Sequence, residues 1–305
     1  MKLQQLKYVR EIARRGLSIS AASNAMHTSQ PGVSNQVQLL EEELGLQIFE
    51  RHGKRLTGLT SFGQLVIKMA DRVLLDVENI RQLADDNKND QLGTLSIGTT
   101  HTQARYALPK AIKAFSKFYP HVHLNMVQGT PTEIAEMAAT GRVDIAIATE
   151  GLAQFDTLAI LPCYEWNRSI VVPPNHPLLL EKKLTLNAIA EYPILTYVMG
   201  FTGRGQQDQA FIEQGLTPNV VFTATDADVI KTYVELDLGI GIIASMAFDP
   251  IKDAPLQALD VSHLFKPSTT HMGIRRGSYL RGFSYDFIEH LAPHLTRKVV
   301  EKAIA

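Results

Sequence analysis

Strand-like and helix-like segments alternate along the chain from Gly93 onward, and this alternation constrains the fold more than any other feature of the sequence. The run DIAIAT at residues 144–149 is an apolar strand between helical patterns, and the same succession recurs up to GIGIIAS at residues 239–245. Strands joined by helical crossovers form a parallel sheet that is covered on both faces. The pattern restarts near residue 169, so we expect two α/β lobes in series. The expected domain covers residues 91–305, with lobe 1 at about 91–163 and 266–305 and lobe 2 at about 164–265.

Two such lobes predict a ligand cleft between them, because ligands of open α/β sheets bind beyond the carboxyl ends of the strands. Three predicted strand ends carry neutral polar side chains, which are Thr100, Thr102 and Gln103, then Thr149, then Thr202. Hydroxyls, amides and the backbone N–H groups of helix N-termini bind small anions without a fixed positive charge. The sequence therefore predicts a site for a small anion.

Two further features qualify this prediction. Arg105 or Arg204 would add a positive charge to the site. Alternatively, each threonine only caps a helix, and Thr225 with Asp228 is fully explained in this way as a capping box.

The N-terminal region contains a helix with one apolar stripe. Val33, Val37, Leu40 and Leu44 follow helical spacing, and Gly45 is a typical C-terminal stop. Thr28 or Ser29 is expected to cap the helix, and Pro31 fits its first turn. The face away from the stripe is formed by Pro31, Ser34, Asn35 and Gln38.

A short Ala-rich helix, SISAASNAMH, precedes this helix across a tight joint, with Ser18 or Ser20 as its cap. Such a pair is typical of a helix-turn-helix, whose second helix reads base edges in the major groove. The first 58 residues hold eight basic residues against five acidic ones, and the excess lies in ERHGKRLTGLT, which predicts a hairpin wing. The alternative is a helix pair that only packs. The predicted DNA-binding residues are Ser29, Gln30, Pro31, Ser34, Asn35, Gln38, Arg51, Lys54 and Arg55.

The segment AASNAMHTSQPGVSNQVQLLEEELGLQIFERHGKRLTGLTSFGQ resembles the winged helix-turn-helix of LysR-type transcriptional regulators. The resemblance implies a DNA-binding domain over residues 1–59 that binds double-stranded promoter DNA. The recognition helix of this family is often basic where this chain has Asn35 and Gln38.

Residues 60–90 are helical by pattern, and an apolar seam runs along them at near-heptad spacing. About 25 residues would give a rod of roughly 38 Å. We expect a linker that pairs with a second copy, as the linker helices of LysR-type regulators do, in a homodimer or homotetramer. A core helix of one domain is the alternative. The seam consists of Phe62, Val66, Met69, Val73, Val77, Ile80 and Ala84.

The remaining residues resemble the two-lobed effector domain of the same family. Motifs such as THTQARYALP, AIATE, GFTGR and FTATDADVIKTYV are similar to the CysB/Cbl subfamily, closest to its CysB branch. The resemblance implies control of cysteine-biosynthesis and sulfate-uptake genes, with N-acetylserine or O-acetylserine as inducer and sulfate-type anions opposing. It implies an effector cleft lined by Thr100, Thr102, Gln103, Thr149 and Thr202, with Trp166 nearby.

Two alternatives remain open for the function. A Cbl-like regulator would sense adenosine phosphosulfate and control sulfonate use or sulfate-starvation genes. A protein of another class, either a small-molecule binding protein or an enzyme, would use the two-lobed domain alone.

Composition excludes several classes of protein. Cys163 is the only cysteine, so no intramolecular disulfide forms, and neither a signal-peptide pattern nor a membrane-spanning apolar run is present. GIGIIA lacks the full pattern of a dinucleotide site. We expect a cytoplasmic protein with no catalytic residue, no metal site and no cofactor other than the effector. Its partners would be promoter DNA, the effector, a further copy and RNA polymerase, with no membrane.

Overall fold

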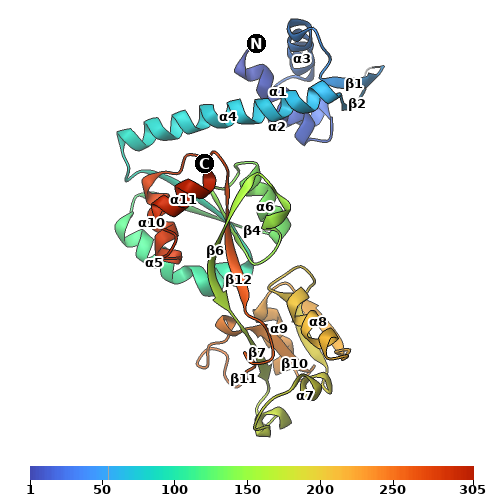
Figure 1. Cartoon of the computed structure of the whole chain (residues 1–305), viewed down its shortest axis with the longest axis vertical. Helices are drawn as coiled ribbons and strands as arrows, with labels where there is room; N and C mark the ends of the chain where they lie inside the picture. The colour runs from blue at the N-terminus through green and yellow to red at the C-terminus, as the bar shows by residue number, and fades with distance from the viewer. Residues whose placement is uncertain (54) are drawn as a thin grey trace. The chain divides into compact units, whose positions relative to one another are not determined.

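The computed structural model describes residues 1–53 and 55–305. The chain forms two compact units, Met1–Ala84 and Asp85–Ala305, which are described separately (Figure 1). No helix within the described residues is long and apolar enough to cross a membrane.

The first unit contains the predicted helix-turn-helix and wing. Ser18 caps α2, accepting from the Ala21 N–H at 3.2 Å, and Ser29 caps α3, accepting from the Gly32 N–H at 3.3 Å. The positive φ of Gly45, 68°, ends α3 as the sequence predicted. The elements are α1 (Leu3–Arg14), α2 (Ile19–Ala25), α3 (Gln30–Leu44), β1 (Phe49–His52), β2 (Arg55–Leu59) and α4 (Ser61–Lys88), which continues into the second unit.

Helix α3 buries most of its apolar stripe. Val33, Val37 and Leu40 lie in one core with Val9 and Ile12 of α1. Leu44, which the sequence placed on the same stripe, is partly exposed at the end of the helix. The opposite face of α3 is therefore left free.

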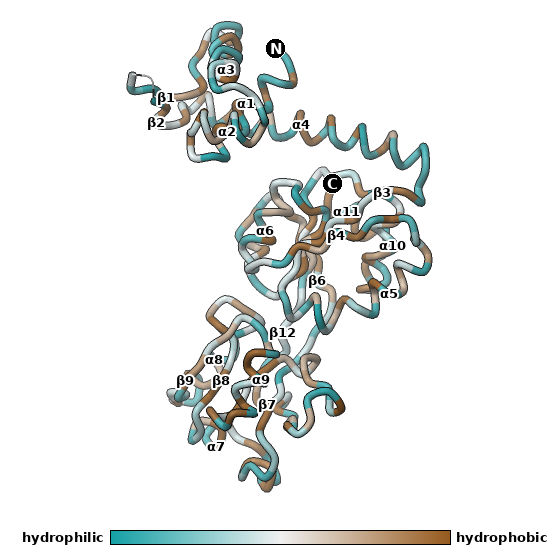
Figure 2. Tube along the Cα trace, turned by 180° about the vertical axis from the view of Figure 1, so that it is seen from behind, coloured by the Kyte–Doolittle hydropathy of each residue, from teal (hydrophilic) through white to brown (hydrophobic). Residues whose placement is uncertain are grey.

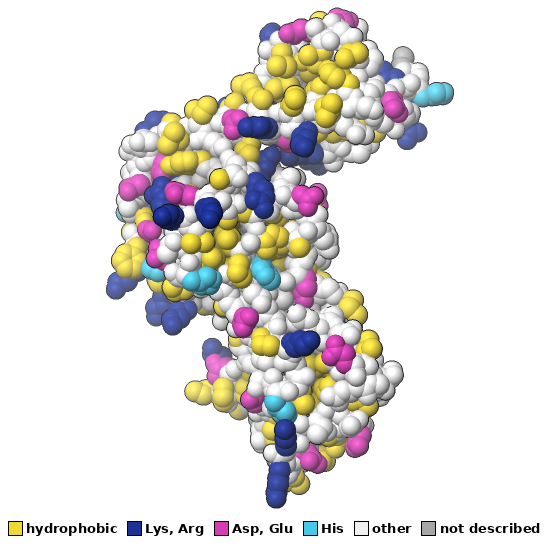
Figure 3. All heavy atoms as spheres, viewed as in Figure 1, with side chains coloured by type: hydrophobic (Ala, Val, Ile, Leu, Met, Phe, Trp, Pro, Cys, Tyr) yellow, Lys and Arg dark blue, Asp and Glu magenta, His cyan; other side chains and the backbone are white. Residues whose placement is uncertain are grey.

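Helix α4 packs on this core through Phe62 and Val66 of the predicted seam and through residues outside it. Its buried residues are Gly63, Ala70 and Leu74, and a Cβ on Gly63 would lie 1.9 Å from the Ile48 carbonyl oxygen. By contrast, Met69 and Ile80 of the predicted seam are 69% and 66% exposed. The tube of Figure 2 alternates between hydrophilic and hydrophobic residues along α4, and hydrophobic side chains are visible along it in Figure 3.

The second unit contains two five-stranded sheets, ordered β4-β3-β5-β12-β6 and β11-β7-β10-β8-β9. Strand β3 pairs in parallel with β4 and β5, and β8 pairs in parallel with β9 and β10, as the alternating pattern predicted. The strands are β3 (Gly93–Thr99), β4 (Val122–Gln128), β5 (Ile145–Ala148), β6 (Leu158–Trp166), β7 (Arg168–Val172), β8 (Ile194–Tyr197), β9 (Val220–Ala224), β10 (Ile240–Ala244), β11 (Gln257–Asp260) and β12 (Ser268–Arg275).

The sequence analysis missed an antiparallel half of the first sheet. The long strands β6 and β12 pair antiparallel along their whole length, and both connect the two sheets. The chain leaves the first sheet after Trp166 and re-enters it at Ser268. These two connections bring residues of both lobes together at one place.

Helices cover both sheets. They are α5 (Leu108–Phe118), α6 (Pro131–Ala139), α7 (Leu186–Ala190), α8 (Arg204–Glu213), α9 (Ala227–Glu235), α10 (Gly282–Leu291) and α11 (Arg297–Ile304), with the π-helical turn η1 (Gln103–Ala107) and the 3-10 turns η2 (Leu152–Gln154), η3 (Pro177–Leu180) and η4 (Ser245–Ala247). The predicted capping box of Thr225 and Asp228 is wrong. Asp226 caps α9 instead, and accepts from the Val229 N–H at 3.0 Å, because a short carboxylate satisfies the third N–H of the helix without help from Thr225.

Candidate functional site

The free face of α3 presents the polar residues that the sequence singled out. Ser29, Gln30, Pro31, Asn35 and Gln38 are exposed, and Ser34 is half-buried. The Gln38 amide donates to Glu42 Oε1 at 2.9 Å, so it is held along the helix surface. Lys54 lies outside the described residues.

The wing is fixed to α3 by a buried carboxylate that the sequence analysis missed. Glu41 is only 3% exposed, and its Oε1 accepts from the backbone N–H groups of Ile48 and Phe49 at 2.8 and 3.1 Å. Its Oε2 accepts from Arg51 Nη2 at 2.8 Å. Arg51 is therefore partly engaged inside the unit, although its side chain remains accessible at the wing.

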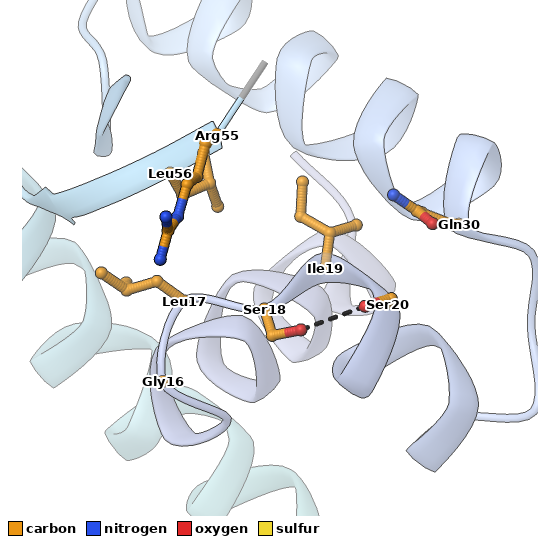
Figure 4. A pocket seen from close by; sticks show the side chains of 8 residues that line it. All are labelled: Gly16, Leu17, Ser18, Ile19, Ser20, Gln30, Arg55 and Leu56. Atoms are coloured by element: carbon orange, nitrogen blue, oxygen red, sulfur yellow. Dashed lines mark hydrogen bonds between the residues drawn. The ribbon is translucent and has the colours of Figure 1, made fainter. Parts of the chain in front are cut away.

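A cavity of about 420 Å³ lies between the wing and the start of α2. Figure 4 shows the Arg55 side chain extending from β2 over this cavity toward the turn before α2. The Ser18 and Ser20 hydroxyls also line the cavity and lie 3.1 Å apart. A cation and hydroxyls around one concave surface are suited to binding the phosphate backbone of a nucleic acid. The lining residues are Gly16, Leu17, Ser18, Ile19, Ser20, Gln30, Arg55 and Leu56.

In the second unit, the polar residues predicted at the strand ends are mostly buried. Thr100, Thr102, Gln103 and Thr202 are all below one-tenth exposed, and Thr149 is half-buried. The Thr102 hydroxyl is buried and forms no hydrogen bond of normal geometry with the described residues. Thr202 has a positive φ of 47°, which is strained for a β-branched residue. An unsatisfied buried hydroxyl and a strained backbone are both typical of a ligand site.

Trp166 and Gln103 meet at a threonine that the sequence analysis did not identify. Thr270 Oγ1 accepts from Trp166 Nε1 at 3.1 Å and from Gln103 Nε2 at 3.3 Å. The Tyr164 hydroxyl donates to Gln103 Oε1. Strands β6 and β12, which connect the lobes, thereby orient the Gln103 amide.

Arg168 supplies a buried positive charge near this region that the sequence analysis missed, and Arg204, which the sequence had proposed, is buried as well. Its Nη2 donates to the Gly203 carbonyl oxygen at 2.7 Å and to Ser268 Oγ at 2.9 Å. Burial lowers the pKa of Arg168 to about 10. Arg105 pairs with Asp228 at 2.7 Å, and Arg204 pairs with Asp208 at 2.7 Å, so both of those charges are already partnered.

Glu150 is a second charged residue near this region that the sequence analysis missed. Its carboxylate accepts from the Gly203 N–H at the start of α8, and its Oε2 is buried without a partner among the described residues. Burial raises the pKa of Glu150 to about 7, although the Gly203 N–H and the charge of Arg168 oppose this shift. A cavity of about 410 Å³ adjoins it, lined by Thr149, Glu150, Met199, Gly200, Gly205, Gln206, Thr269 and His271.

One group of residues has the composition of a metal site. Ligand atoms of His101, Asp226 and Asp228 lie within 4.8 Å of one another. Asp228 already accepts from the Tyr106 hydroxyl at 2.6 Å and lies 3.3 Å from Lys231 Nζ, and Asp226 caps α9. Arg105 and Lys231 already balance the charge of Asp228. The absence of a metal site stays a prediction.

A winged helix-turn-helix followed by a two-lobed α/β domain with a polar cleft defines the class: a DNA-binding transcriptional regulator with a small-molecule domain. Residues 3–64 match the model of bacterial regulatory helix-turn-helix proteins of the lysR family, and residues 88–296 match that of the LysR substrate binding domain. The chain belongs to the LysR family of bacterial transcriptional regulators.

The similarity to known proteins extends over nearly the whole chain. The transcriptional regulator CysB of Haemophilus influenzae is 51% identical over 303 residues, which cover 99% of this chain and 94% of CysB. The regulator SsuR of Burkholderia cenocepacia is 51% identical over 295 residues, 97% of this chain and 96% of SsuR. The cofactor-binding domain of the Cbl regulator has a similar structure, with a TM-score of 0.69 and 42% identity over 71% of this chain and 95% of that domain.

Proposed function

We propose that this LysR-type regulator controls sulfur-assimilation and cysteine-biosynthesis genes in response to a small effector that binds in the cleft of the second unit. The similarity to CysB, SsuR and Cbl over almost the full length supports this assignment. A Cbl-like regulator of sulfonate or sulfate-starvation genes, which senses adenosine phosphosulfate, is the second candidate, and the same similarity favours it.

The observation that carries the effector site is the buried Thr102 hydroxyl. It is 1% exposed and has no hydrogen bond of normal geometry within the described residues, in a region that also holds Gln103 and Thr202. A buried hydroxyl that lacks a well-formed hydrogen bond costs up to about 1–3 kcal/mol, and a ligand oxygen would reduce this cost. We propose Thr100, Thr102, Gln103, Thr149 and Thr202 as effector ligands, with Trp166 holding Gln103 through Thr270.

Promoter DNA would be bound through the free face of α3 and through the wing. Gln30, Asn35 and Gln38 supply amides of the kind that read adenine, while Arg55 lies at the cavity beside the wing and suits a phosphate. Ser29, Pro31, Ser34, Arg51 and Lys54 complete the proposed surface.

Helix α4 would pair with α4 of a second copy. Leu65, Met69, Val73, Ile80 and Leu83 are exposed along it, and a row of exposed apolar residues on a long helix suits a partner helix. Pairing would place two recognition helices on two half-sites in a cytoplasmic homodimer or homotetramer.

One titration tests the proposed function. The purified protein is bound to the promoter of a cysteine-biosynthesis or sulfonate-utilisation gene while sulfate, N-acetylserine, O-acetylserine or adenosine phosphosulfate is added. A change in operator affinity or in DNA bending with one of the acetylserines supports the CysB-like function, and a response to adenosine phosphosulfate alone supports the Cbl-like one. Operator binding that none of the four changes would contradict both.

A further inference from the structure

Glu150 lies where a ligand anion would be expected to bind. It follows β5 of the first sheet, and its carboxylate accepts from the Gly203 N–H at the start of α8, which covers the second sheet. The N-terminal N–H groups of a helix are a preferred site for an oxyanion. Part of this site is therefore already occupied by a carboxylate of the chain itself.

The other carboxylate oxygen is left without a hydrogen bond. Glu150 Oε2 is buried and has no partner among the described residues. Of the charged side chains nearby, Arg168 of β7 donates to the Gly203 carbonyl oxygen and to Ser268, and Arg204 of α8 is paired with Asp208. His271 of β12 lines the same cavity as Glu150. Oε2 is thus a buried acceptor that the described residues leave without a hydrogen bond of normal geometry.

The chemistry of this acceptor distinguishes between ligand classes. An ionised carboxylate only accepts hydrogen bonds, and a fully deprotonated oxyanion such as sulfate also only accepts them, so the two repel each other. A ligand with an N–H, ammonium or hydroxyl group can donate to Oε2 instead. The adjoining cavity, about 410 Å³, has the size of a site for a small organic molecule.

We propose that Glu150 is a specificity-determining residue of the effector cleft, which selects a small organic acid with an N–H or ammonium donor over a bare oxyanion. This inference rests on the proposed function, because it assumes that the threonine-lined cleft is the effector site. The acidic group of the ligand would meet the threonines, and its donor would meet Oε2.

The test compares two probes on three forms of the full-length protein. Calorimetry at about pH 8, where Glu150 is mostly ionised, measures the affinities for inorganic sulfate and for N-acetylserine. Glu150→Gln removes the charge at nearly constant shape. Glu165→Gln removes the same charge from an exposed position on β6 and is the matched control.

In Glu150→Gln we expect sulfate to bind about tenfold more tightly and N-acetylserine to bind equally or more weakly, while Glu165→Gln leaves both affinities unchanged. An unchanged ratio of the two affinities in Glu150→Gln overturns the inference, and so does a wild-type protein that prefers sulfate to both N-acetylserine and O-acetylserine. A wild-type protein that binds none of these ligands overturns the proposed effector site, and this inference with it.

A measurement on the wild-type protein keeps the test valid if Glu150→Gln does not fold. Lowering the pH from about 8 to about 6 protonates Glu150, so sulfate affinity should rise while N-acetylserine affinity rises less. A His271→Asn variant is measured in parallel as a control, because His271 lines the same cavity as Glu150. If the two ligands respond equally to pH in both proteins, Glu150 does not discriminate between them.

Discussion

The Glu41 carboxylate of α3 accepts from Arg51 Nη2 of β1 at 2.8 Å while also accepting from two backbone N–H groups at the start of the wing. The pair links the helix proposed to read bases to the hairpin proposed to contact phosphates. The Glu41 carboxylate is almost completely buried, so the geometry of the wing depends on a polar contact inside the unit.

Replacement of Glu41 should therefore destabilise the first unit. Glu41→Ala leaves Arg51 unpaired and the N–H groups of Ile48 and Phe49 without their acceptor, at a cost of about 3 kcal/mol. Urea unfolding followed by circular dichroism measures the loss. Glu78→Gln, on an exposed part of α4, is the control and should change stability by less than about 0.5 kcal/mol. Equal unfolding midpoints for the two variants would show that the buried carboxylate does not hold the wing.

Loss of the Thr102 hydroxyl should weaken effector binding and leave the fold intact. Thr102→Val keeps the shape of the side chain and removes its hydroxyl. This hydroxyl has no hydrogen bond of normal geometry within the described residues, so the folded protein should lose little stability. The effector should bind about tenfold more weakly, measured by calorimetry with sulfate and N-acetylserine. Thr217→Val, at an exposed position, is the matched control. Unchanged affinity for both ligands would remove Thr102 from the site.

The raised pKa of Glu150 predicts a pH-dependent stability. Its pKa is about 7 in the folded protein, compared with 4.5 for an ordinary glutamate, so the folded state binds this proton more tightly than the unfolded state. The wild-type protein therefore loses stability relative to Glu150→Gln as the pH rises from about 4.5 to about 7, by up to about 3 kcal/mol. Thermal unfolding from pH 5 to pH 8 should show a growing advantage of Glu150→Gln. A constant difference would contradict the raised pKa.

A charge on the exposed face of α4 should prevent pairing between copies. Ile80→Asp places a carboxylate on the row of exposed apolar residues, where burial against a partner helix would be costly. Sedimentation should show a smaller assembly, and promoter affinity should fall because two half-sites are no longer held together. Gln64→Asp, at another exposed position of the same helix, should keep the wild-type assembly. A full-size assembly of Ile80→Asp would place the interface elsewhere.

Local patterns were sufficient to predict much of the fold. The stripe of Val33, Val37 and Leu40 identified α3, and alternating segments identified the parallel strands, because each signal depends on neighbouring residues alone. The antiparallel pair of β6 and β12 was missed because its residues are about a hundred positions apart and β6 contains Pro162.

Some residues of the candidate site could be predicted from the sequence, and others could not. The polar residues at strand ends were predictable, since strand ends are visible in the sequence. Glu150 and Arg168 were not, because both act through Gly203, which lies dozens of residues away in the chain. On α4, the predicted seam of larger apolar residues left out Gly63, Ala70 and Leu74, which are its buried residues, because a seam pattern gives no signal for the close approach of Gly63 to Ile48.

The proposed DNA surface predicts that one substitution reduces the preference for a particular base and that another reduces the affinity for any DNA. Gln38→Ala removes an amide suited to a base edge, so it should relax sequence preference by about 1–3 kcal/mol at one base pair and change non-specific affinity little. Because Gln38 donates to Glu42 in the free protein, Glu42→Ala is the control that releases the amide without removing it.

Arg55→Ala should instead weaken binding to specific and random DNA alike, and should reduce the slope of log affinity against log salt by about 1. This follows from the position of Arg55 over the cavity beside the wing, where a phosphate rather than a base edge is expected. Gel-shift titrations of both variants on operator and random duplexes, at several salt concentrations, separate the two effects. If Gln38→Ala and Arg55→Ala reduced specific and random binding in the same proportion, the proposed division between base reading on α3 and phosphate binding at the wing would be wrong.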